Sequence, residues 1–366
     1  MKTVVISGYY GYENIGDEAL LAAIVGALKT EIADLHVIVL SARPDETAGR
    51  YGVESVSRIN VGAVFSALRR ADLLISGGGS LLQDVTGPLT IPYYLSIVAM
   101  AKMMGKPVMF YAQGIGPVNG GFGKRMIKLL ADKVEVITLR DAASLDFLRE
   151  LGVSRPVIEV TADPVFGLDL HKVKSNPKQV PETSAIKSAG KPIMGLFIRE
   201  WQGLEPCLES LAGLADYMMD QGWEVVFIPM QYPADLTPVR GVAQRMKLFP
   251  VIVEEGLGFR SLTKLISSLD LVIGMRLHAL IIAAVCEVPM LGLSYDPKVS
   301  EFMDMLEQPV LKDLSGLSQE TLIKAVDDIL ADKAEIRGKL HEKSLELSQK
   351  ALRNAKLAVE LLNSKK

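Results

Sequence analysis

Hydrophobic and polar positions along the chain alternate in blocks that predict strands and helices in turn. Short runs of β-branched and aliphatic residues predict strands, and longer amphipathic segments between them predict helices. Such an alternation is typical of a parallel sheet covered by helices on both faces. In the first half we predict strands at Val4–Ile6, Val37–Leu40, Leu73–Ile75, Val108–Phe110, Val136–Ile137 and Val157–Val160, and helices at Glu18–Thr30, Pro92–Met104, Gly123–Lys133 and Asp141–Glu150.

The alternation stops between His171 and Lys191, where Lys, Pro and Ser dominate and no apolar period is visible, so this segment predicts a linker. It then resumes, and from Gln319 onward the pattern is helical throughout. The predicted elements here are strands at Ile193–Ile198, Val225–Pro229, Val251–Val253, Asp270–Gly274 and Pro289–Ser294 and a helix near Leu208–Gln221.

The pattern therefore predicts an α/β protein with two Rossmann-like domains, a glycosyltransferase-B-like architecture closed by C-terminal helices. We place the N-terminal domain at 1–171, the linker at 172–191, the C-terminal domain at 192–317 and the helices at 318–366. Ligands of such sheets bind beyond the carboxyl ends of the strands, and we expect those ends to face an interdomain cleft.

Composition narrows the class of protein. The chain has 366 residues, which favours two domains, and 49% hydrophobic with 23% charged residues is ordinary for a globular protein. A net charge of −3 gives no reason to expect a nucleic-acid partner. The two cysteines lack metal-ligand spacing, and neither a signal peptide nor a membrane-spanning run is recognisable. We expect a soluble, cytoplasmic protein.

Two glycine-rich loops follow predicted strands. The first, Gly8–Glu18, does not have the spacing of a dinucleotide-binding fingerprint, and its Asp17 suits either a helix N-cap or a substrate or catalytic role. The second contains Gly77, Gly78 and Gly79 and fits either a bound anion or sugar or a tight strand–helix crossing. Gln113–Pro117 repeats this loop pattern more weakly.

Basic residues also stand directly after predicted strands. Arg140 suits carboxylate or phosphate binding, although an ion pair with Asp141 or Asp146 is an alternative. Arg276 and His278 begin an apolar helix after Gly274, which favours a functional histidine over a structural one. Lys298 lies in the next such loop, where a solvated lysine is the alternative. Signatures of metallohydrolases, P-loop NTPases and serine or cysteine hydrolases are missing from the sequence.

The ordered set of motifs resembles the polysaccharide pyruvyltransferase family, including bacterial enzymes of the CsaB type. Single motifs are weak, but the set runs in order over roughly residues 1–300. The segments that carry the resemblance are Asn14–Glu18, Gly77–Ser80, Gln113–Pro117, Arg140–Asp141, Asp163–Pro164, Arg276–Ala279 and Tyr295–Lys298.

The resemblance implies transfer of pyruvate from phosphoenolpyruvate to a sugar as a cyclic ketal, without a cofactor or a metal. For CsaB-like members it implies an N-acetylmannosamine acceptor on a lipid-linked precursor of a cell-wall polymer that anchors S-layer proteins. We predict catalytic roles for His278, Lys298 and Asp17, donor binding by Arg140, Arg276, Lys298, Gly77, Gly78 and Gly79, and acceptor binding by Asn14, Gln83 and Gln231.

Two other functions compete with this interpretation. A nucleotide-sugar glycosyltransferase of the same architecture would need a nucleoside diphosphate site, and a non-catalytic protein would bind an anion or a sugar without turnover. A lipid-linked acceptor also suggests peripheral contact with the inner membrane face. The segment Gly123–Leu130 mixes bases and apolar residues as an interfacial helix does, although a helix packed on its sheet has the same pattern.

Overall fold

The computed structural model describes residues 1–85, 87–168 and 190–364, which form two compact units. The first unit comprises Met1–Leu168 and Leu347–Lys366, and the second comprises Asp169–Glu346. Most of the predicted linker, 172–191, lies outside the described residues. The two units group residues by contact, and the first unit includes the end of the chain. The domain boundaries predicted from the sequence therefore stay predictions.

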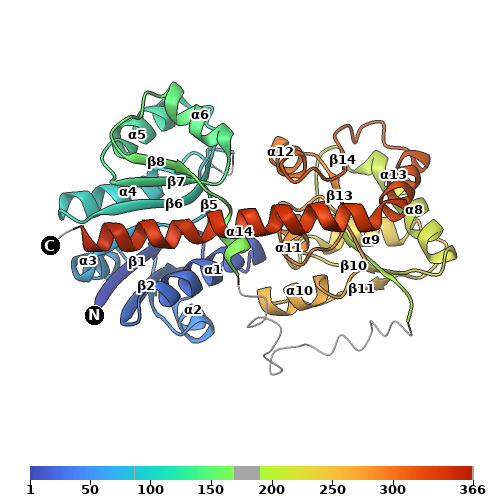
Figure 1. Ribbon diagram of the computed structural model, residues 1–366, viewed down its shortest axis with the longest axis horizontal. Coiled ribbons are helices and arrows are strands. Elements are labelled where there is room, and N and C mark those ends of the chain that lie inside the picture. Colours follow the sequence, from blue (N-terminus) through green and yellow to red (C-terminus); the bar gives the residue numbers. More distant parts are fainter. Residues whose placement is uncertain (86, 169–189, 365–366) are drawn as a thin grey trace. The chain divides into compact units, whose positions relative to one another are not determined.

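The first unit is built on an eight-stranded parallel sheet (Figure 1). Its strand order is β3-β2-β1-β4-β6-β7-β8, with β5 paired to β6. All six strands predicted for this half are present. The strands are β1 (Lys2–Ser7), β2 (Leu35–Ser41), β3 (Glu54–Ser57), β4 (Leu73–Ser76), β5 (Gly79–Leu82), β6 (Val108–Ile115), β7 (Val136–Leu139) and β8 (Val157–Val160).

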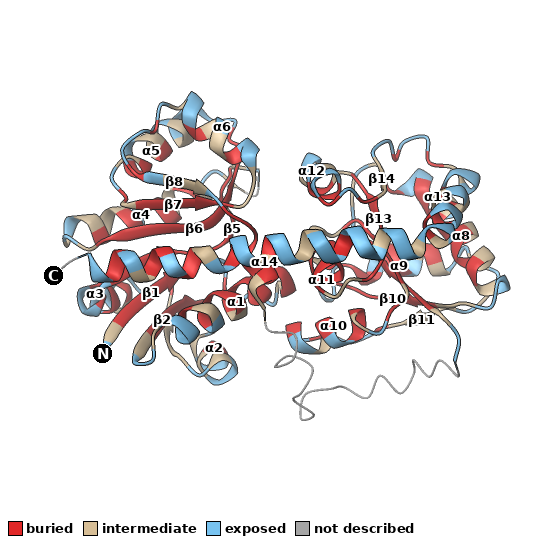
Figure 2. Ribbon diagram, viewed as in Figure 1, coloured by how far each residue is buried: buried red, intermediate tan, exposed pale blue. Residues whose placement is uncertain are grey.

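Alternate residues of this sheet enter hydrophobic cores on its two faces, as the pleat of a strand requires. Val5 joins the core packed by α3, α4, α5 and α6, whereas Val4 and Ile6 join the core packed by α1 and the end of α14 (Lys333–Asn363). The buried strands between exposed helix surfaces are visible in Figure 2. The helices are α1 (Ile15–Glu31), α2 (Pro44–Tyr51), α3 (Val61–Arg70), α4 (Thr90–Met103), α5 (Gly121–Ala131), α6 (Ala142–Glu150) and the 3₁₀ helix η1 (Pro164–Gly167).

The second unit contains a six-stranded parallel sheet of order β11-β10-β9-β12-β13-β14. One of its cores packs α8 and α13 against β9 and β10. Its strands are β9 (Ile193–Phe197), β10 (Glu224–Phe227), β11 (Val251–Ile252), β12 (Leu271–Gly274), β13 (Met290–Leu293) and β14 (Val310–Leu311). Its helices are η3 (Glu205–Cys207), α8 (Leu208–Asp220), α9 (Leu236–Ala243), α10 (Phe259–Ile266), α11 (Leu277–Val285), α12 (Pro297–Met305) and α13 (Gln319–Ala331).

The chain ends in one long helix, α14 (Lys333–Asn363), which begins in the second unit and ends in the first. Its last part is anchored by Asn354, which is fully buried and accepts a hydrogen bond from the Thr161 hydroxyl at 2.9 Å. Ala358 and Leu361 of the same segment enter the core over β1 and β2. The predicted C-terminal helices are therefore present, and the last of them completes the first unit.

Two sequence predictions about loops are wrong. Gly79 does not lead into a helix but opens β5, a short strand paired with β6. Gln113 is not in a loop either, because β6 continues to Ile115. Both segments look like loops in the sequence because their glycines interrupt the hydrophobic run. In the folded sheet, neighbouring strands supply hydrogen-bond partners that keep these residues extended.

Candidate functional site

The carboxyl edge of the first sheet collects polar side chains from loops that are distant in sequence. Arg58 follows β3, Asp17 lies in the helix after β1, and Ser80 lies on β5. Arg140 follows β7 and Asp163 follows β8. Because parallel strands end at the same edge, these residues converge where ligands of α/β sheets bind.

Helix α1 begins one turn earlier than predicted, so Asp17 is not its N-cap. Asn14 caps the helix, with its Oδ1 accepting from the Gly16 amide at 3.1 Å. Asp17 therefore lies in the first helical turn, half-buried, and is not needed as a cap. Asn14, which we predicted to bind the acceptor, has this structural role, and its acceptor role stays a prediction.

Asp17 has an unusual electrostatic environment. Burial raises the pKa of its carboxyl to about 7, against the nearby guanidinium of Arg140, which lowers it. The carboxylates of Glu18 and Asp163 add to the rise. A carboxyl group that titrates near neutral pH can both give and take a proton, as general acid–base catalysis requires.

Neighbouring side chains pack tightly against the glycine triplet Gly77–Gly79. A Cβ on Gly77 would collide with the buried hydroxyl of Tyr10 and crowd Ile6 at 3.2 Å. A Cβ on Gly79 would stand 3.4 Å from an Asp17 carboxylate oxygen, and Gly79 has a φ of +97°, which favours glycine. Close packing thus accounts for Gly77 and Gly79, although the segment leads into β5 and not into a helix, and anion binding by the three glycines stays a prediction.

Gln113 fixes this loop from the neighbouring strand. Its side-chain amide donates to the Ser76 carbonyl at 3.2 Å and to the Gly77 carbonyl at 3.3 Å. The preceding residue, Ala112, has a φ of +45° where the register between β6 and β7 shifts. The strand is therefore irregular directly before Gln113, whose amide holds the start of the glycine loop.

Arg140 is held rigidly beside Asp17. It donates to Asp163 Oδ2 at 2.8 Å and to Ser80 Oγ at 3.1 Å, and its side chain is 9% exposed. The partner is therefore Asp163 rather than Asp146, and Asp141 lies at the limit, with 4.0 Å between Arg140 Nε and Oδ2. A guanidinium fixed in this way needs no rearrangement to act on an anion.

The second sheet has a corresponding set at its carboxyl edge. Arg276 is the N-cap of α11 and forms a bidentate ion pair with Asp235, which is 1% exposed. Asp235 also accepts from the backbone amide of Gln231 at 2.9 Å, and the Arg276 side chain reaches Gln231 Oε1 at 3.4 Å. Arg276 therefore links two loops through its side chain, and donor binding by this residue stays a prediction.

His278 and Lys298 lie where the sequence predicts. His278 is in the first turn of α11 and Lys298 in the first turn of α12, and both residues are half-buried. Asp296 caps α12 by accepting from the backbone amide of Lys298 at 2.9 Å. Because β12 and β13 are neighbours, the two side chains belong to adjacent loops of the same edge.

The sequence reasoning missed Arg199, which follows β9 at this edge. Its guanidinium donates to the Tyr295 hydroxyl at 2.6 Å and lies 4.8 Å from the centre of that ring. The signal was available, because Arg199 ends a buried strand in the same manner as Arg140. The sequence names Asp163 only within the Asp163–Pro164 motif, and it does not predict that Asp163 and Asp235 pair with arginines from distant segments.

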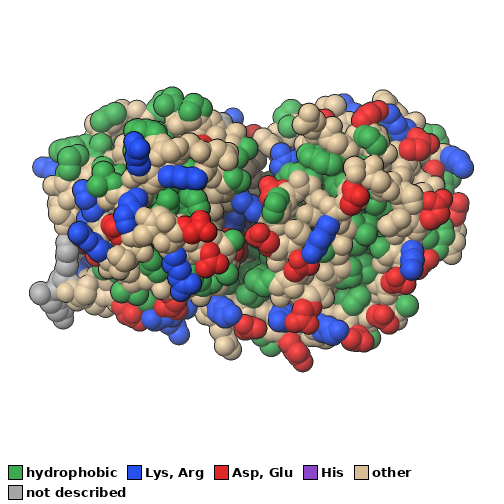
Figure 3. Space-filling model, turned by 90° about the horizontal axis from the view of Figure 1, so that it is seen from above, with side chains coloured by type: hydrophobic (Ala, Val, Ile, Leu, Met, Phe, Trp, Pro, Cys, Tyr) green, Lys and Arg blue, Asp and Glu red, His purple; other side chains and the backbone are tan. Residues whose placement is uncertain are grey.

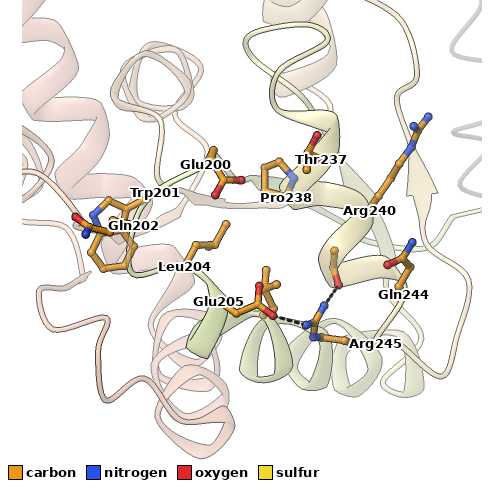
Figure 4. Close-up of a pocket in the computed structure, with 12 residues that line it drawn as sticks. Glu200, Trp201, Gln202, Leu204, Glu205, Thr237, Pro238, Arg240, Gln244 and Arg245 are labelled. Carbon is orange, nitrogen blue, oxygen red and sulfur yellow. Dashed lines mark hydrogen bonds and ion pairs between the residues drawn. The ribbon is translucent and has the colours of Figure 1, made fainter. Parts of the chain in front are cut away.

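Two pockets lie near these edges. One of about 320 Å³ in the first unit is lined by Asp84 and residues around Phe122, next to Gln83, which is buried and accepts from the Val85 amide. The other, of about 470 Å³, lies in the second unit between the loop after β9 and α9 (Figure 4). Trp201 and Gln202 line one side, and Arg245, bonded to Glu205, lines the other.

Within each unit the structure brings the predicted residues together. Asp17, Arg140 and Gly79 gather in the first, and Gln231, Arg276, His278 and Lys298 lie on neighbouring loops of the second. Common action of the two sets on one substrate stays a prediction. Among the described residues, no three His, Cys, Asp or Glu side chains are close enough to hold a metal ion. Nor does any described helix combine the length and the apolarity needed to cross a bilayer.

Comparison with known families decides the class of this protein. The model of the polysaccharide pyruvyl transferase family matches residues 14–297. The chain belongs to the polysaccharide pyruvyl transferase family. The matched range includes Asp17, Arg140, Arg276 and His278 and ends one residue before Lys298. The chain is thus a transferase of the pyruvyl transferase type, acting in polysaccharide synthesis.

Similar proteins agree with this family and with the fold. The amylovoran biosynthesis protein AmsJ of Erwinia amylovora is 23% identical over 291 residues, covering 74% of this chain and 68% of AmsJ. A putative UDP-N-acetylglucosamine 2-epimerase from Listeria monocytogenes superposes with a TM-score of 0.72 at 14% identity, covering 100% and 98% of the two chains. Anabaena Alr3699/HepE in complex with UDP-glucose gives 0.67 at 15% identity, covering 100% of each. The predicted glycosyltransferase-B-like fold is confirmed.

Proposed function

We propose that this pyruvyl transferase uses phosphoenolpyruvate as donor and forms a cyclic ketal on a sugar. The observation that carries the proposal is that Asp17, whose carboxyl has a pKa of about 7, lies within electrostatic reach of Arg140, whose guanidinium is fixed by Asp163. Together they offer a proton-transfer group beside an anion-binding group at the edge of the first sheet. Phosphoenolpyruvate requires both, since it carries a carboxylate and a phosphate and must be protonated on carbon.

The reaction balances without a cofactor. A proton adds to the methylene carbon, which leaves an oxocarbenium-like centre at C2. One sugar hydroxyl attacks C2, phosphate leaves with the C–O bonding electrons, and a second hydroxyl of the same sugar closes the ketal. Of the two hydroxyl protons released, one replaces the proton given to the methyl group and the other leaves with phosphate.

The residues divide between these steps. His278 and Lys298, on adjacent loops, supply a titratable imidazole and a cation, and Asp17 supplies a second acid–base group. Arg140 binds donor charge in its fixed position, with the glycine loop Gly77–Gly79 beside it. Arg276 is proposed to bind donor charge as well, since its pairing with Asp235 resembles that of Arg140 with Asp163.

For the acceptor we propose N-acetylmannosamine of a lipid-linked precursor of a secondary cell-wall polymer, the product serving S-layer anchoring. Asn14, Gln83 and Gln231 are the proposed contacts. This acceptor would place the enzyme in the cytoplasm, with peripheral contact at the inner membrane face. On the face of the first unit seen in Figure 3, basic and hydrophobic side chains stand among acidic ones, and the first two kinds suit such contact. Phe122 and Leu129 of α5 are 69% and 58% exposed.

One experiment tests the reaction class. In D2O, with unlabelled phosphoenolpyruvate and acceptor, the transferred pyruvyl group should gain at least one deuterium on its methyl carbon, with one phosphate released per transfer. Mass spectrometry and proton NMR of the sugar read both results. A methyl group without deuterium, or an enolpyruvyl ether that keeps its methylene carbon, would refute the mechanism.

The same experiment separates a second candidate. Alr3699/HepE has been solved with UDP-glucose, so a protein that binds a nucleotide sugar shares this fold. That activity would transfer a sugar from a nucleotide and leave no carbon-bound deuterium. Product formation from UDP-glucose without phosphoenolpyruvate would favour it.

A further inference from the structure

The loop after β1 presents two aromatic rings at the carboxyl edge of the first sheet. Tyr9 and Tyr12 stack with their ring centres 4.3 Å apart and their planes 12° from parallel. They are 40% and 45% exposed, although tyrosine rings usually bury most of their surface. An ordered, exposed aromatic pair at a ligand-binding edge therefore calls for a partner.

A buried arginine holds this pair in place. Arg58 is 7% exposed, and its guanidinium carbon lies 5.2 Å from the Tyr12 ring centre and 5.9 Å from that of Tyr9. Tyr93 and Tyr94 of α4 enclose it from the other side and receive hydrogen bonds of 3.1 and 3.3 Å. Among the described residues its hydrogen-bond partners are hydroxyls and a carbonyl, with no carboxylate within ion-pairing distance. The Arg58 guanidinium is thus held among the aromatic rings without an ion-pair partner in the described part of the chain.

The backbone of the same loop is tethered at three points. Arg58 donates to the Gly8 carbonyl at 3.1 Å, and the Ala42 amide donates to the Tyr10 carbonyl at 3.0 Å. The Gly11 amide donates to the buried carboxylate of Glu18 at 3.1 Å. Gly11 has a φ of +79°, and a Cβ there would come within 2.7 Å of the Arg43 amide nitrogen. The rings are therefore preorganised, which lowers the entropy cost of binding.

The pair lies next to the proposed chemistry. Asp17 is close enough to Tyr9 to contribute to the raised pKa of its hydroxyl, after burial and Tyr12. Tyr12 and Asp17 are five residues apart across the start of α1. The pair and Asp17 therefore belong to the same loop and first helical turn after β1.

We propose that the Tyr9–Tyr12 pair is a platform on which the acceptor sugar ring stacks. A pyranose has a face of C–H groups, which suits the negative face of an aromatic ring, and a rim of hydroxyls, which suits the tyrosine hydroxyls. An uncharged sugar needs no counter-ion from the platform, and Arg58 offers it none. This inference rests on the proposed function, because it assigns the acceptor subsite of that reaction.

Saturation-transfer NMR of the full chain with the methyl glycoside of N-acetylmannosamine, without donor, tests the platform directly. We expect transfer from the tyrosine ring protons to the sugar C–H groups in the wild type and in Tyr12→Phe. Tyr9→Ala and Tyr12→Ala should weaken binding about tenfold, the scale of one lost ring contact. The control is Phe249→Ala, which removes a 96% exposed ring just before β11, at the amino-terminal edge of the second sheet.

In turnover assays, Tyr9→Ala and Tyr12→Ala should raise the KM for the acceptor about tenfold and leave the KM for phosphoenolpyruvate unchanged.

The outcomes separate the platform from the reaction. Sugar binding that depends on both rings, without turnover of phosphoenolpyruvate, would support the platform and reject the donor assignment. Equal sugar binding in Tyr12→Ala and the wild type, or no transfer in the wild type, would overturn the platform even if pyruvate is transferred. Ring-dependent binding of UMP in place of the sugar would also overturn it, because the platform would then serve a nucleotide base.

Discussion

The carboxyl edges of the two sheets hold their arginines in similar ways but differ in the carboxyl groups around them. Each edge has one arginine paired with a buried aspartate, Arg140 with Asp163 and Arg276 with Asp235. In the second unit Asp235 also accepts from two backbone amides, so the arginine and the loop form one closed network. In the first unit an additional carboxyl, Asp17, stands beside the pair.

The two edges also differ in how far an arginine is surrounded by tyrosine rings. Arg58 is buried among four tyrosine rings, whereas Arg199 is half-exposed and touches one ring. With Asp17 protonated, Arg58 and Arg140 face the carboxylates of Asp163 and Glu18, and loss of the Asp17 proton adds one negative charge to this edge. The first edge can therefore change its net charge near neutral pH, and the Arg276–Asp235 pair of the second edge is fixed.

The largest expected effect is on stability, at Arg276. Arg276→Ala should lower the free energy of unfolding of the second unit by about 3–5 kcal/mol, because Asp235 would stay buried without its partner. Arg199→Ala, at a half-exposed site, should cost about 1 kcal/mol or less. Urea unfolding followed by fluorescence measures both. A stable Arg276→Ala variant with a raised KM for phosphoenolpyruvate would contradict the structural link and leave donor binding as the role of Arg276.

The next effect is on catalysis, at His278. His278→Ala should lower kcat/KM at least about 100-fold, the scale of one lost acid–base contribution, with the fold preserved. Arg140→Ala and Lys298→Ala should cost a similar factor through lost charge stabilisation. His341→Ala is the matched control, because that imidazole is 53% exposed and pairs with Glu287 in the same unit. Near-normal phosphate release by His278→Ala, measured beside His341→Ala, would remove the assignment.

A smaller and pH-dependent effect is expected at Asp17. Its folded pKa of about 7 lies above the ordinary value, so the folded state favours the protonated form. The destabilisation by this carboxyl is absent at pH 4, grows as the pH rises towards 7 and is constant above it. Asp17→Asn should therefore stabilise the protein by roughly 1–3 kcal/mol at pH 8 and by little at pH 4.

Thermal unfolding at the two pH values measures that difference, and the pH dependence of kcat/KM provides a second test. The wild type should show an apparent pKa near 7 that disappears in Asp17→Asn, together with most of the activity. A stability gain that is equal at pH 4 and pH 8 would contradict the raised pKa. Glu13→Gln, at an exposed residue of the same loop, is the control.

The sequence predicts the architecture and the placement of the basic residues but not their pairing. A buried run that ends in a glycine or a charged residue predicts that Arg140 and His278 follow strands, because strand ends and helix starts are local signals. The pairing of Arg276 with Asp235 spans 41 residues, and the pair forms only when β10 and β12 lie in one sheet. The tyrosine enclosure of Arg58 likewise joins three separate segments. Strand β5 is unpredictable from its own residues, since Gly79 and Ser80 favour a loop until β6 offers hydrogen bonds.

The smallest expected effect concerns the proposed membrane contact of the first unit. Helix α5 carries Lys124, Arg125 and Lys128, and exposed Phe122 and Leu129 offer apolar area for the headgroup region. Lys128 is partly engaged by Asp132, with 3.4 Å between Nζ and Oδ2, so Lys124 should contribute more. Each base near an anionic surface is worth about 1 kcal/mol, so Lys124→Gln should weaken binding to anionic vesicles about fivefold. Phe122→Ala should weaken vesicle binding as well, and Phe65→Ala, which removes a 51% exposed ring on α3, should not.

Co-sedimentation with vesicles at low and high salt measures the bound fraction. Binding that is equal for neutral and anionic vesicles and for all three variants would show that α5 merely covers its sheet.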